Sequence, residues 1–231
     1  YGNEFYVARA VRSCGLPRNE LFITNKLWKS FRTADAAVQV CKKSLKLMKL
    51  DYFDLYLVHW PVSITEDGWQ DINAEVWSGL ERLYEDGLAR AIGVSNYKIH
   101  HLNALRRSAH ILPMVNQIEC HPGCLPAELI QYCRQQGIAL QAWRPLGSGE
   151  TLSHPLLREL GCSHGASPAQ ICLAWCRLHG LVPLPRSRSE ERMRENLEFS
   201  HVALSPQDME RLNALEDVGC SGLDADGRQP D

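Results

Sequence analysis

The feature that most constrains the fold of this 231-residue chain is an alternation of short apolar runs with longer amphipathic runs. The short runs, typical of strands, lie at 21–26, 53–59, 88–96, 113–119, 138–143 and 181–187. The longer runs predict helices over 33–50, 75–87, 125–136, 153–162, 168–179 and 206–216, with Thr33 or Asp35 capping the first and Gly87 closing the second. The order predicts an α/β chain in which each strand is followed by a helix.

The strands are too apolar on both faces to lie at a wet surface, which indicates a parallel sheet covered by helices. Such a sheet is either open and doubly wound or closed into a barrel. A doubly wound dinucleotide fold carries G-x-G-x-x-G after an early strand, and the chain has no such string. We therefore favour a barrel, with residues 1–231 as a single domain.

Composition excludes several classes of protein. A net charge of -2 creates no general attraction for nucleic acid or an acidic membrane surface. Nine cysteines are an odd number, which favours reduced thiols in a cytoplasmic protein over a disulfide scaffold. The sequence contains neither an apolar run of about 18 residues nor a signal-peptide pattern, so we expect no membrane association.

Polar residues gather where the predicted strands end. In a barrel of parallel strands the working residues stand at the carboxyl ends of the strands. Here those ends carry Lys26, His59, Ser95, Asn96, Gln117, Trp143, Arg186 and Ser187. Polar residues are common at strand ends for solubility alone. A functional site is favoured over solubility alone, because an ammonium, an imidazole, amides and a large aromatic side chain would meet at one barrel mouth.

Three of these side chains suit acid catalysis. Lys26 stands among apolar neighbours, where an ammonium needs an acidic or anionic partner. A lone histidine such as His59 is more often a hydrogen-bonded core residue, but Tyr1 changes that balance, because a nearby ammonium lowers the pKa of a phenol. Tyr1, Lys26 and His59 together could protonate a developing alkoxide.

Two cysteine and histidine groupings look like metal sites at first sight. One is the segment CHPGC at 120–124, and the other combines Cys172, Cys176 and His179. Zinc sites normally use four ligands in closer motif spacing, and Cys172 and Cys176 suit the buried face of a helix better. We expect no metal.

The chain resembles the aldo-keto reductase family over almost its whole length. The matching segments occur in the family's order: YGNE, FITNKLW, DLYLVHWP, RAIGVSN, MVNQIECHP, AWRPLGSG and LPRSRSEERMRENLEF. The resemblance implies a (β/α)8 TIM barrel that binds NADPH (NADP+) without a Rossmann motif and reduces aldehydes or ketones to alcohols. A tryptophan at 143, where tyrosine is usual, is similar to a microbial and protozoal branch with short loops.

Residue roles carry over position by position. The resemblance implies that Tyr1 is the general acid, that Lys26 lowers its pKa, and that His59 orients the carbonyl. It assigns the nicotinamide end of the cofactor to Ser95, Asn96, Gln117 and Trp143, and further cofactor contacts to Arg144, Leu146 and Ser148. The phosphate and adenosine end falls to Arg186, Ser187, Arg188, Ser189, Arg192, Glu195 and Asn196, which favours NADPH over NADH. For Arg188 and Arg194, a solvated helix start is an alternative.

The substrate expected from this resemblance is a small-molecule carbonyl compound. Trp28 and Trp60, with His59, would wall its pocket, and the short C-terminal segment favours an open pocket for small substrates. Dicarbonyls, sugar ketoacids, steroid or prostaglandin ketones and lipid aldehydes all stay open. The family expectation is a monomer, and no nucleic acid or membrane partner is expected.

One departure bears on activity. The resemblance implies two strands and one helix before Tyr1, with the aspartate of the catalytic tetrad on the second strand. Six strands do not close an eight-stranded barrel, so we expect an N-terminally incomplete reductase with weakened NADPH binding and low turnover. The alternative is a non-catalytic NADP(H)-binding or structural barrel module.

Overall fold

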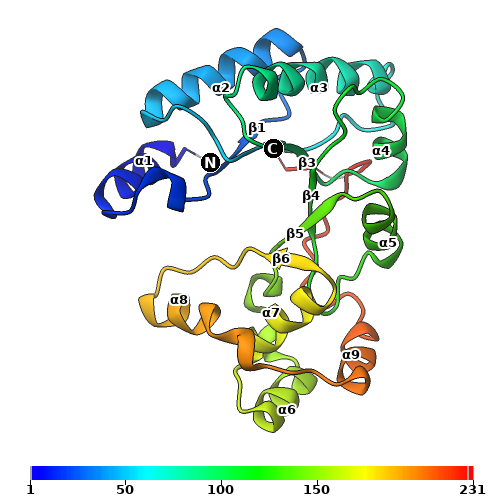
Figure 1. The fold of residues 1–231 in the computed structure, drawn as a ribbon. Coiled ribbons are helices and arrows are strands. Elements are labelled where there is room, and N and C mark those ends of the chain that lie inside the picture. Colours follow the sequence, from blue (N-terminus) through cyan, green and yellow to red (C-terminus); the bar gives the residue numbers. More distant parts are fainter. Residues whose placement is uncertain (1, 228, 231) are drawn as a thin grey trace. The chain divides into compact units, whose positions relative to one another are not determined.

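A computed structural model describes residues 2–227, 229 and 230 of the chain (Figure 1). The described residues fall into two compact units. Of the described residues, unit 1 comprises 2–116, 224–227, 229 and 230, and unit 2 comprises 117–223. Both units contain parallel strands followed by helices, as the sequence predicts.

Six strands lie in the described part of the chain, in the sheet order β1-β2-β3-β4-β5-β6. They are β1 (Thr24–Leu27), β2 (Leu55–Val58), β3 (Ile92–Ser95), β4 (Val115–Glu119), β5 (Ala139–Trp143) and β6 (Leu181–Pro183). In unit 1, β1 pairs in parallel with β2 and β2 with β3, with Lys26 opposite Leu57. In unit 2, β5 pairs in parallel with β6. The predicted parallel α/β fold of six strand–helix units is confirmed.

The strands are shorter than predicted, for local reasons. The N–H of Ile23 donates to the Asp54 carboxylate at 2.8 Å, and the Arg18 guanidinium donates to the Leu21 carbonyl at 2.7 Å. Side chains thus engage the backbone of 21–23, and β1 begins only at Thr24. At the other end of the sequence, β6 ends at Pro183, although the Leu184 N–H still donates to the Ala142 carbonyl at 2.9 Å. Pro185 follows and has no N–H with which to continue the pairing.

The helices of unit 1 are α1 (Glu4–Ser13), α2 (Ala34–Met48), α3 (Trp69–Glu85) and α4 (Ile99–Leu105). Thr33 caps α2, because its hydroxyl accepts the Ala36 N–H at 3.2 Å. Gly87 follows α3 with φ +72° and ends the helix, as predicted. Close contact between α2 and α3 depends on Gly79, where a Cβ would stand 2.7 Å from the Ala34 carbonyl oxygen.

The C-terminal residues of unit 1 lie against α4 and the segment after β2 (Figure 1). The Lys98 ammonium lies 2.7 Å from one carboxylate oxygen of Asp224 and 3.1 Å from one of Asp226. The Gln229 amide donates to the Pro61 carbonyl at 3.1 Å. These contacts tie Asp224, Asp226 and Gln229 to elements more than a hundred positions earlier in the chain.

Unit 2 carries α5 (Ala127–Gln135), α6 (Pro155–His164), α7 (Pro168–Leu178), α8 (Glu190–Leu197) and α9 (Pro206–Asn213). Ser167 and Ser205 start α7 and α9 through reciprocal capping boxes, each followed by a proline. Cys172 and Cys176 are fully buried on α7, which confirms the interpretation of this face as core. None of the described helices has the length and apolar character to cross a membrane.

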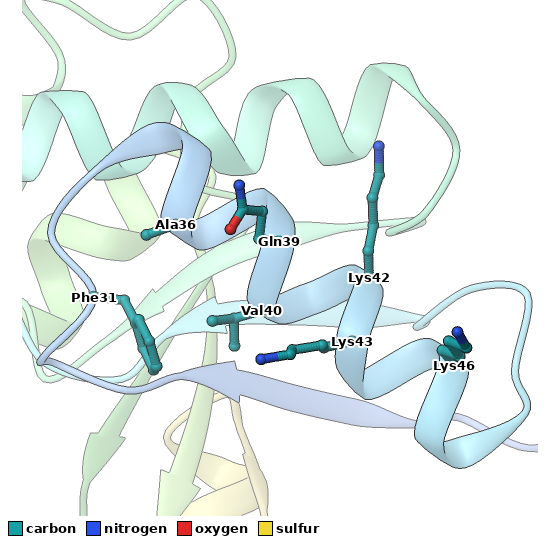
Figure 2. A pocket seen from close by; sticks show the side chains of 7 residues that line it. All are labelled: Phe31, Ala36, Gln39, Val40, Lys42, Lys43 and Lys46. Carbon is teal, nitrogen blue, oxygen red and sulfur yellow. The ribbon is translucent and has the colours of Figure 1, made fainter.

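A hollow of about 480 Å³ lies on the outer side of α2 (Figure 2). Its lining consists of Phe31, Ala36, Gln39, Val40, Lys42, Lys43 and Lys46. None of these residues belongs to the predicted catalytic or cofactor set. The hollow therefore does not mark the candidate active site.

Candidate active site

The predicted catalytic residues of unit 1 stand at the carboxyl ends of neighbouring strands. Lys26 lies on β1 opposite Leu57 of β2 and is half-buried. Its backbone N–H donates to the side-chain oxygen of its neighbour Asn25 at 2.7 Å. Burial lowers the pKa of Lys26 to about 8. A large part of the Lys26 population is therefore ready to lose its proton in mildly alkaline solution.

His59 follows β2 directly. Its backbone N–H donates to the Leu27 carbonyl at 3.0 Å, which places it beside the end of β1. The side chain is 7 % exposed, with its ring centroid 4.8 Å from that of Trp28. Burial, together with the positive charge of Lys26, lowers the pKa of His59 to about 3. At neutral pH this imidazole is uncharged and can donate one hydrogen bond.

Ser95 and Asn96 complete the set at the end of β3. Asn96 takes the left-handed conformation with φ 64°, which turns its amide toward the neighbouring strand. The amide donates to the His59 carbonyl at 3.0 Å and to the Ser95 hydroxyl at 3.2 Å. The structure thus brings Ser95, Asn96 and His59 together.

The two predicted substrate tryptophans differ in exposure. Trp28 is half-buried beside His59, whereas Trp60 is only 4 % exposed, with its ring centroid 6.3 Å from that of His59. The indole N–H of Trp60 has no hydrogen-bond acceptor within the described residues. Tyr1, the predicted general acid, lies outside the described residues.

In unit 2, Gln117 lies on β4 and is 3 % exposed. Its amide donates to the side-chain oxygen of Gln141 on β5 at 2.7 Å. Trp143 ends β5, and its carbonyl accepts the Cys120 N–H at 3.4 Å. The pairing of two glutamines fixes the orientation of the Gln117 amide from the adjacent strand.

The segment after β5 turns sharply. Arg144 has φ 51°, donates to the Gly219 carbonyl at 3.2 Å and lies 3.3 Å from the Glu119 carboxylate. Leu146 is half-buried, and the exposed Ser148 again has a positive φ of 54°. Arg144 therefore already has two partners inside unit 2, which its assignment as a cofactor contact did not foresee.

The predicted phosphate-binding residues lie between β6 and the end of α8. Arg186, Arg188 and Arg192 are exposed, and within the described residues none of the three makes an ion pair. Ser187 and Ser189 form a small turn, in which the Ser187 hydroxyl accepts the Ser189 N–H at 3.1 Å, and Ser189 caps α8. Glu195 is half-buried and Asn196 is buried on the same helix.

Arg194 differs from the other arginines of this segment. Its guanidinium lies 2.8 Å from the Glu190 carboxylate one helical turn earlier. This pairing fits the alternative of a solvated helix face for Arg194. It also makes Arg194 a matched control for its neighbour Arg192.

Sequence reasoning missed two residues that support these sets. Gln141 is the partner of Gln117, and its signal was a lone polar residue inside the apolar run 138–143. Glu119 contacts Arg144 and Ser221, and its position as the last residue of the predicted strand 113–119 was the corresponding signal. A polar residue in a strand does not by itself indicate its partner. The partner becomes clear only when the pairing of the strands is known.

Comparison with known proteins identifies the family that carries this arrangement. The family model described as the Aldo/keto reductase family matches residues 1–217. The chain belongs to the aldo/keto reductase family. The segments that suggested this resemblance in the sequence are thus correctly interpreted.

Individual relatives of this aldo/keto reductase agree. A glyoxal reductase of Bacillus subtilis is 43% identical over 215 residues, which is 93% of this chain and 75% of the relative. The crystal structure of MGS-M4, an aldo-keto reductase from a deep-sea metagenome library, matches 100% of this chain and 84% of its own with a TM-score of 0.92 and 33% identity. A Bombyx mori aldo-keto reductase in complex with NADP gives a TM-score of 0.83 at 31% identity, over 94% of this chain and 75% of its own.

Proposed function

We propose that this aldo/keto reductase reduces aldehydes and ketones to alcohols with NADPH. The observation that carries the proposal is the half-buried ammonium of Lys26 beside an uncharged, buried His59 at the ends of paired strands. These are two of the residue types that acid-assisted carbonyl reduction requires. The family match supports carbonyl chemistry in general terms.

In this proposal each residue of unit 1 has one task. The neutral imidazole of His59 donates a hydrogen bond to the carbonyl oxygen and orients it. Tyr1 gives its phenolic proton to that oxygen as negative charge develops there. The Lys26 ammonium stabilises the phenolate that results, which lowers the pKa of the phenol. Trp28 forms an apolar wall beside His59 and limits the access of water.

The chain's own donor set fits a phosphorylated dinucleotide. Arg186, Arg188 and Arg192 offer exposed guanidinium groups, and Ser187 adds a hydroxyl beside the start of α8. Guanidinium groups bind phosphate through paired hydrogen bonds, which favours a cofactor with a 2′-phosphate. The bound cofactor would supply the hydride. In unit 2, Gln117 would hold the carboxamide of the nicotinamide and Trp143 would stack on its face.

We infer small aldehydes, including dicarbonyls, as the preferred substrates. The name of the Bacillus subtilis relative supports this choice, and the family's small carbonyl substrates are consistent with it. A cytoplasmic location and a monomeric state complete the proposal.

The test is turnover by the 231-residue chain with NADPH and either glyoxal or para-nitrobenzaldehyde, followed as loss of NADPH absorbance. We expect consumption of NADPH that depends on the aldehyde, slower consumption with NADH, and formation of one alcohol per NADPH. Lys26→Met should lower kcat by about 100-fold or more, the range of general acid–base catalysis.

The competing function is a barrel that binds NADP(H) without turnover. It predicts tight NADPH binding, measured by quenching of tryptophan fluorescence, together with no aldehyde-dependent oxidation. An outcome with neither binding nor turnover would contradict both functions. Lys29→Met is the matched control for Lys26→Met. Lys29 lies three positions after Lys26 and does not belong to the predicted catalytic set.

A further inference from the structure

A tight turn in unit 2 holds His121 and Cys124 opposite each other. The Cys124 N–H donates to the His121 carbonyl at 2.8 Å, and the His121 N–H donates back to the Cys124 carbonyl at 3.3 Å. Pro122 and Gly123 occupy the two central positions, and Gly123 has φ +98°. Proline followed by a glycine with positive φ is the signature of a type II turn. The turn is thus a rigid frame for two side chains.

A third side chain reaches this turn from the end of unit 2. Gly123 forms a bridge with Glu216, and the Cys220 thiol donates to the Gly123 carbonyl at 3.1 Å. A Cβ on Gly123 would stand 2.7 Å from the Cβ of Val218, so only glycine permits this close approach. The Thr151 hydroxyl donates to the Val218 carbonyl at 3.2 Å and so holds the segment that carries Cys220 from another side.

One nitrogen of His121 and the sulfur atoms of Cys124 and Cys220 all lie within 4.8 Å of one another. A tetrahedral zinc ion, with Zn–S of about 2.3 Å and Zn–N of about 2.0 Å, needs ligand atoms roughly 3.5 to 3.8 Å apart. Small side-chain rotations therefore suffice to bring the three atoms around one ion.

His121 supplies an independent indication of a ligand. Its side chain is fully buried, and its Nδ1 lies 3.1 Å from the Pro122 carbonyl oxygen. The other ring nitrogen, Nε2, lies 3.6 Å from the Glu119 carboxylate, beyond ordinary hydrogen-bond distance. A histidine that binds metal through one nitrogen commonly donates its other N–H to a carbonyl or a carboxylate. In His121 each ring nitrogen lies toward such an acceptor, Nδ1 toward the Pro122 carbonyl and Nε2 toward the Glu119 carboxylate, so either nitrogen can bind the ion while the other is oriented.

We propose that His121, Cys124 and Cys220 form a binding site for a thiophilic divalent cation, for which Zn²⁺ is the best match. Imidazole and thiolate are the ligands that zinc prefers, and three protein ligands leave a fourth position for water. On binding, the two thiols lose their protons to solvent, two sulfur–metal bonds and one nitrogen–metal bond form, and no group is oxidised. The site is separate from carbonyl reduction and does not depend on it.

Sequence spacing alone did not point to this set. It grouped Cys120 with Cys124, but Cys120 is buried, and its carbonyl oxygen lies against the Cys176 thiol at 3.6 Å. The third ligand, Cys220, comes from a distant part of the sequence. The bridge between Gly123 and Glu216 and the contact between Val218 and Thr151 bring it to the turn.

The test is titration of the metal-free 231-residue chain with Co²⁺, after reduction with a phosphine. Co²⁺ reports thiolate ligands through a charge-transfer band in the near ultraviolet and tetrahedral geometry through its visible bands. We expect both signals at one equivalent of Co²⁺, and their loss when Zn²⁺ is added. Competition with a chromophoric chelator then gives the Zn²⁺ affinity.

Cys124→Ser and Cys220→Ser should each weaken Zn²⁺ binding by about 100-fold or more, since even partners outside the ligand set cost about 10–100-fold. Cys162→Ser, at an exposed cysteine of α6, is the matched control and should change nothing. Circular dichroism of each variant shows whether the fold is kept.

Three results would overturn the proposal. The first is absence of the thiolate band in the reduced wild-type chain. The second is unchanged Zn²⁺ affinity in a folded Cys220→Ser variant. The third is binding that survives both cysteine substitutions but is lost in His100→Gln, which would place the ion at the other group of nearby ligand atoms, His100, His101 and Asp226.

Discussion

The rings of Trp28 and His59 stand 4.8 Å apart, centroid to centroid, with their planes tilted by 51°. The contact covers the imidazole and helps to keep water from it, and burial is the main cause of the low pKa of His59, about 3. An uncharged His59 can donate one hydrogen bond to a substrate oxygen. It carries no positive charge, so Lys26 remains the group that stabilises a developing negative charge. Trp28 thus contributes to the burial that keeps His59 uncharged.

Trp28→Ala should raise the pKa of His59 from about 3 toward its ordinary value of 6.5, because water then reaches the ring and stabilises the imidazolium. NMR titration of the His59 ring resonances measures this change. Trp28→Phe keeps an aromatic wall and should leave the pKa low. Equal pKa values in the wild-type chain and Trp28→Ala would show that Trp28 does not protect the ring.

Lys26→Met should stabilise the fold while it removes activity. Burial lowers the pKa of Lys26 from 10.5 to about 8, so Lys26 stays largely charged at neutral pH but its ammonium is less stable in the folded chain than in the unfolded chain. The unfolded chain binds more protons between about pH 8 and 10.5, and the wild-type free energy of unfolding should therefore rise with pH in that window.

Urea unfolding at several pH values checks both statements. Lys26→Met should be about 1–2 kcal/mol more stable at pH 7 and should lack the contribution of Lys26 to the alkaline rise. Wild-type turnover should fall as the pH rises through about 8, where Lys26 loses its proton. A Lys26→Met variant less stable than wild type at pH 7 would contradict this interpretation of the buried ammonium.

Arg192→Gln should raise the KM for NADPH by about tenfold. The KM for NADH should rise much less, because NADH has no 2′-phosphate for Arg192 to bind. A charge-assisted hydrogen bond to phosphate is worth about 1.5 kcal/mol or more, and 1.4 kcal/mol is a factor of ten. Arg194→Gln is the control, because Arg194 pairs with Glu190 on the exposed side of α8. Equal effects on the two cofactors would exclude a contact between Arg192 and the 2′-phosphate.

Asp226→Asn should loosen residues 224–229. Burial alone would raise the pKa of Asp226, but the hydrogen bond from Lys98 and the neighbouring histidines lower it below 3.8. This stabilisation is present above pH 3.8 and is lost as the pH falls through the lowered pKa. Hydrogen exchange should show faster exchange in 224–229, with a loss of about 1 kcal/mol at most in global stability. Asp51→Asn, at an exposed loop residue, should have no such effect.

Gly93→Ala should destabilise unit 1 by about 1–3 kcal/mol, the usual cost of overpacking. A Cβ at Gly93 on β3 would stand 2.5 Å from the Val115 carbonyl oxygen and 2.8 Å from a methyl group of Leu57. Both neighbours belong to adjacent strands and cannot move without loss of packing. Thermal unfolding measures the change, and an unaltered melting temperature would contradict the close packing of these strands.

Local pattern was sufficient for much of the fold. The six strand positions, the Thr33 cap and the end of α3 at Gly87 follow from properties of neighbouring residues, and all are present in the structure. The sequence did not reveal α4, because seven residues are too few to show a helical period clearly. It indicated α8 only through the alternative of a solvated helix start for Arg188 and Arg194.

Contacts between distant residues could not be predicted in this way. The pairing of Gln117 with Gln141 depends on which strands are adjacent, and the approach of Cys220 to Cys124 depends on one bridge at Gly123. Residue type indicated that Lys26 and His59 were functional candidates. Their pKa values, however, follow from burial, which only the packed structure supplies.

The most direct test of the proposed chemistry uses NADPH that carries deuterium at the transferred position of its nicotinamide. The 231-residue chain is incubated with this cofactor and para-nitrobenzaldehyde, and the alcohol is analysed by mass spectrometry. Direct hydride transfer predicts deuterium on the carbinol carbon, with Tyr1→Phe and Lys26→Met forming far less of the labelled alcohol. Saturating NADPH binding without any labelled alcohol would contradict carbonyl reduction by this chain.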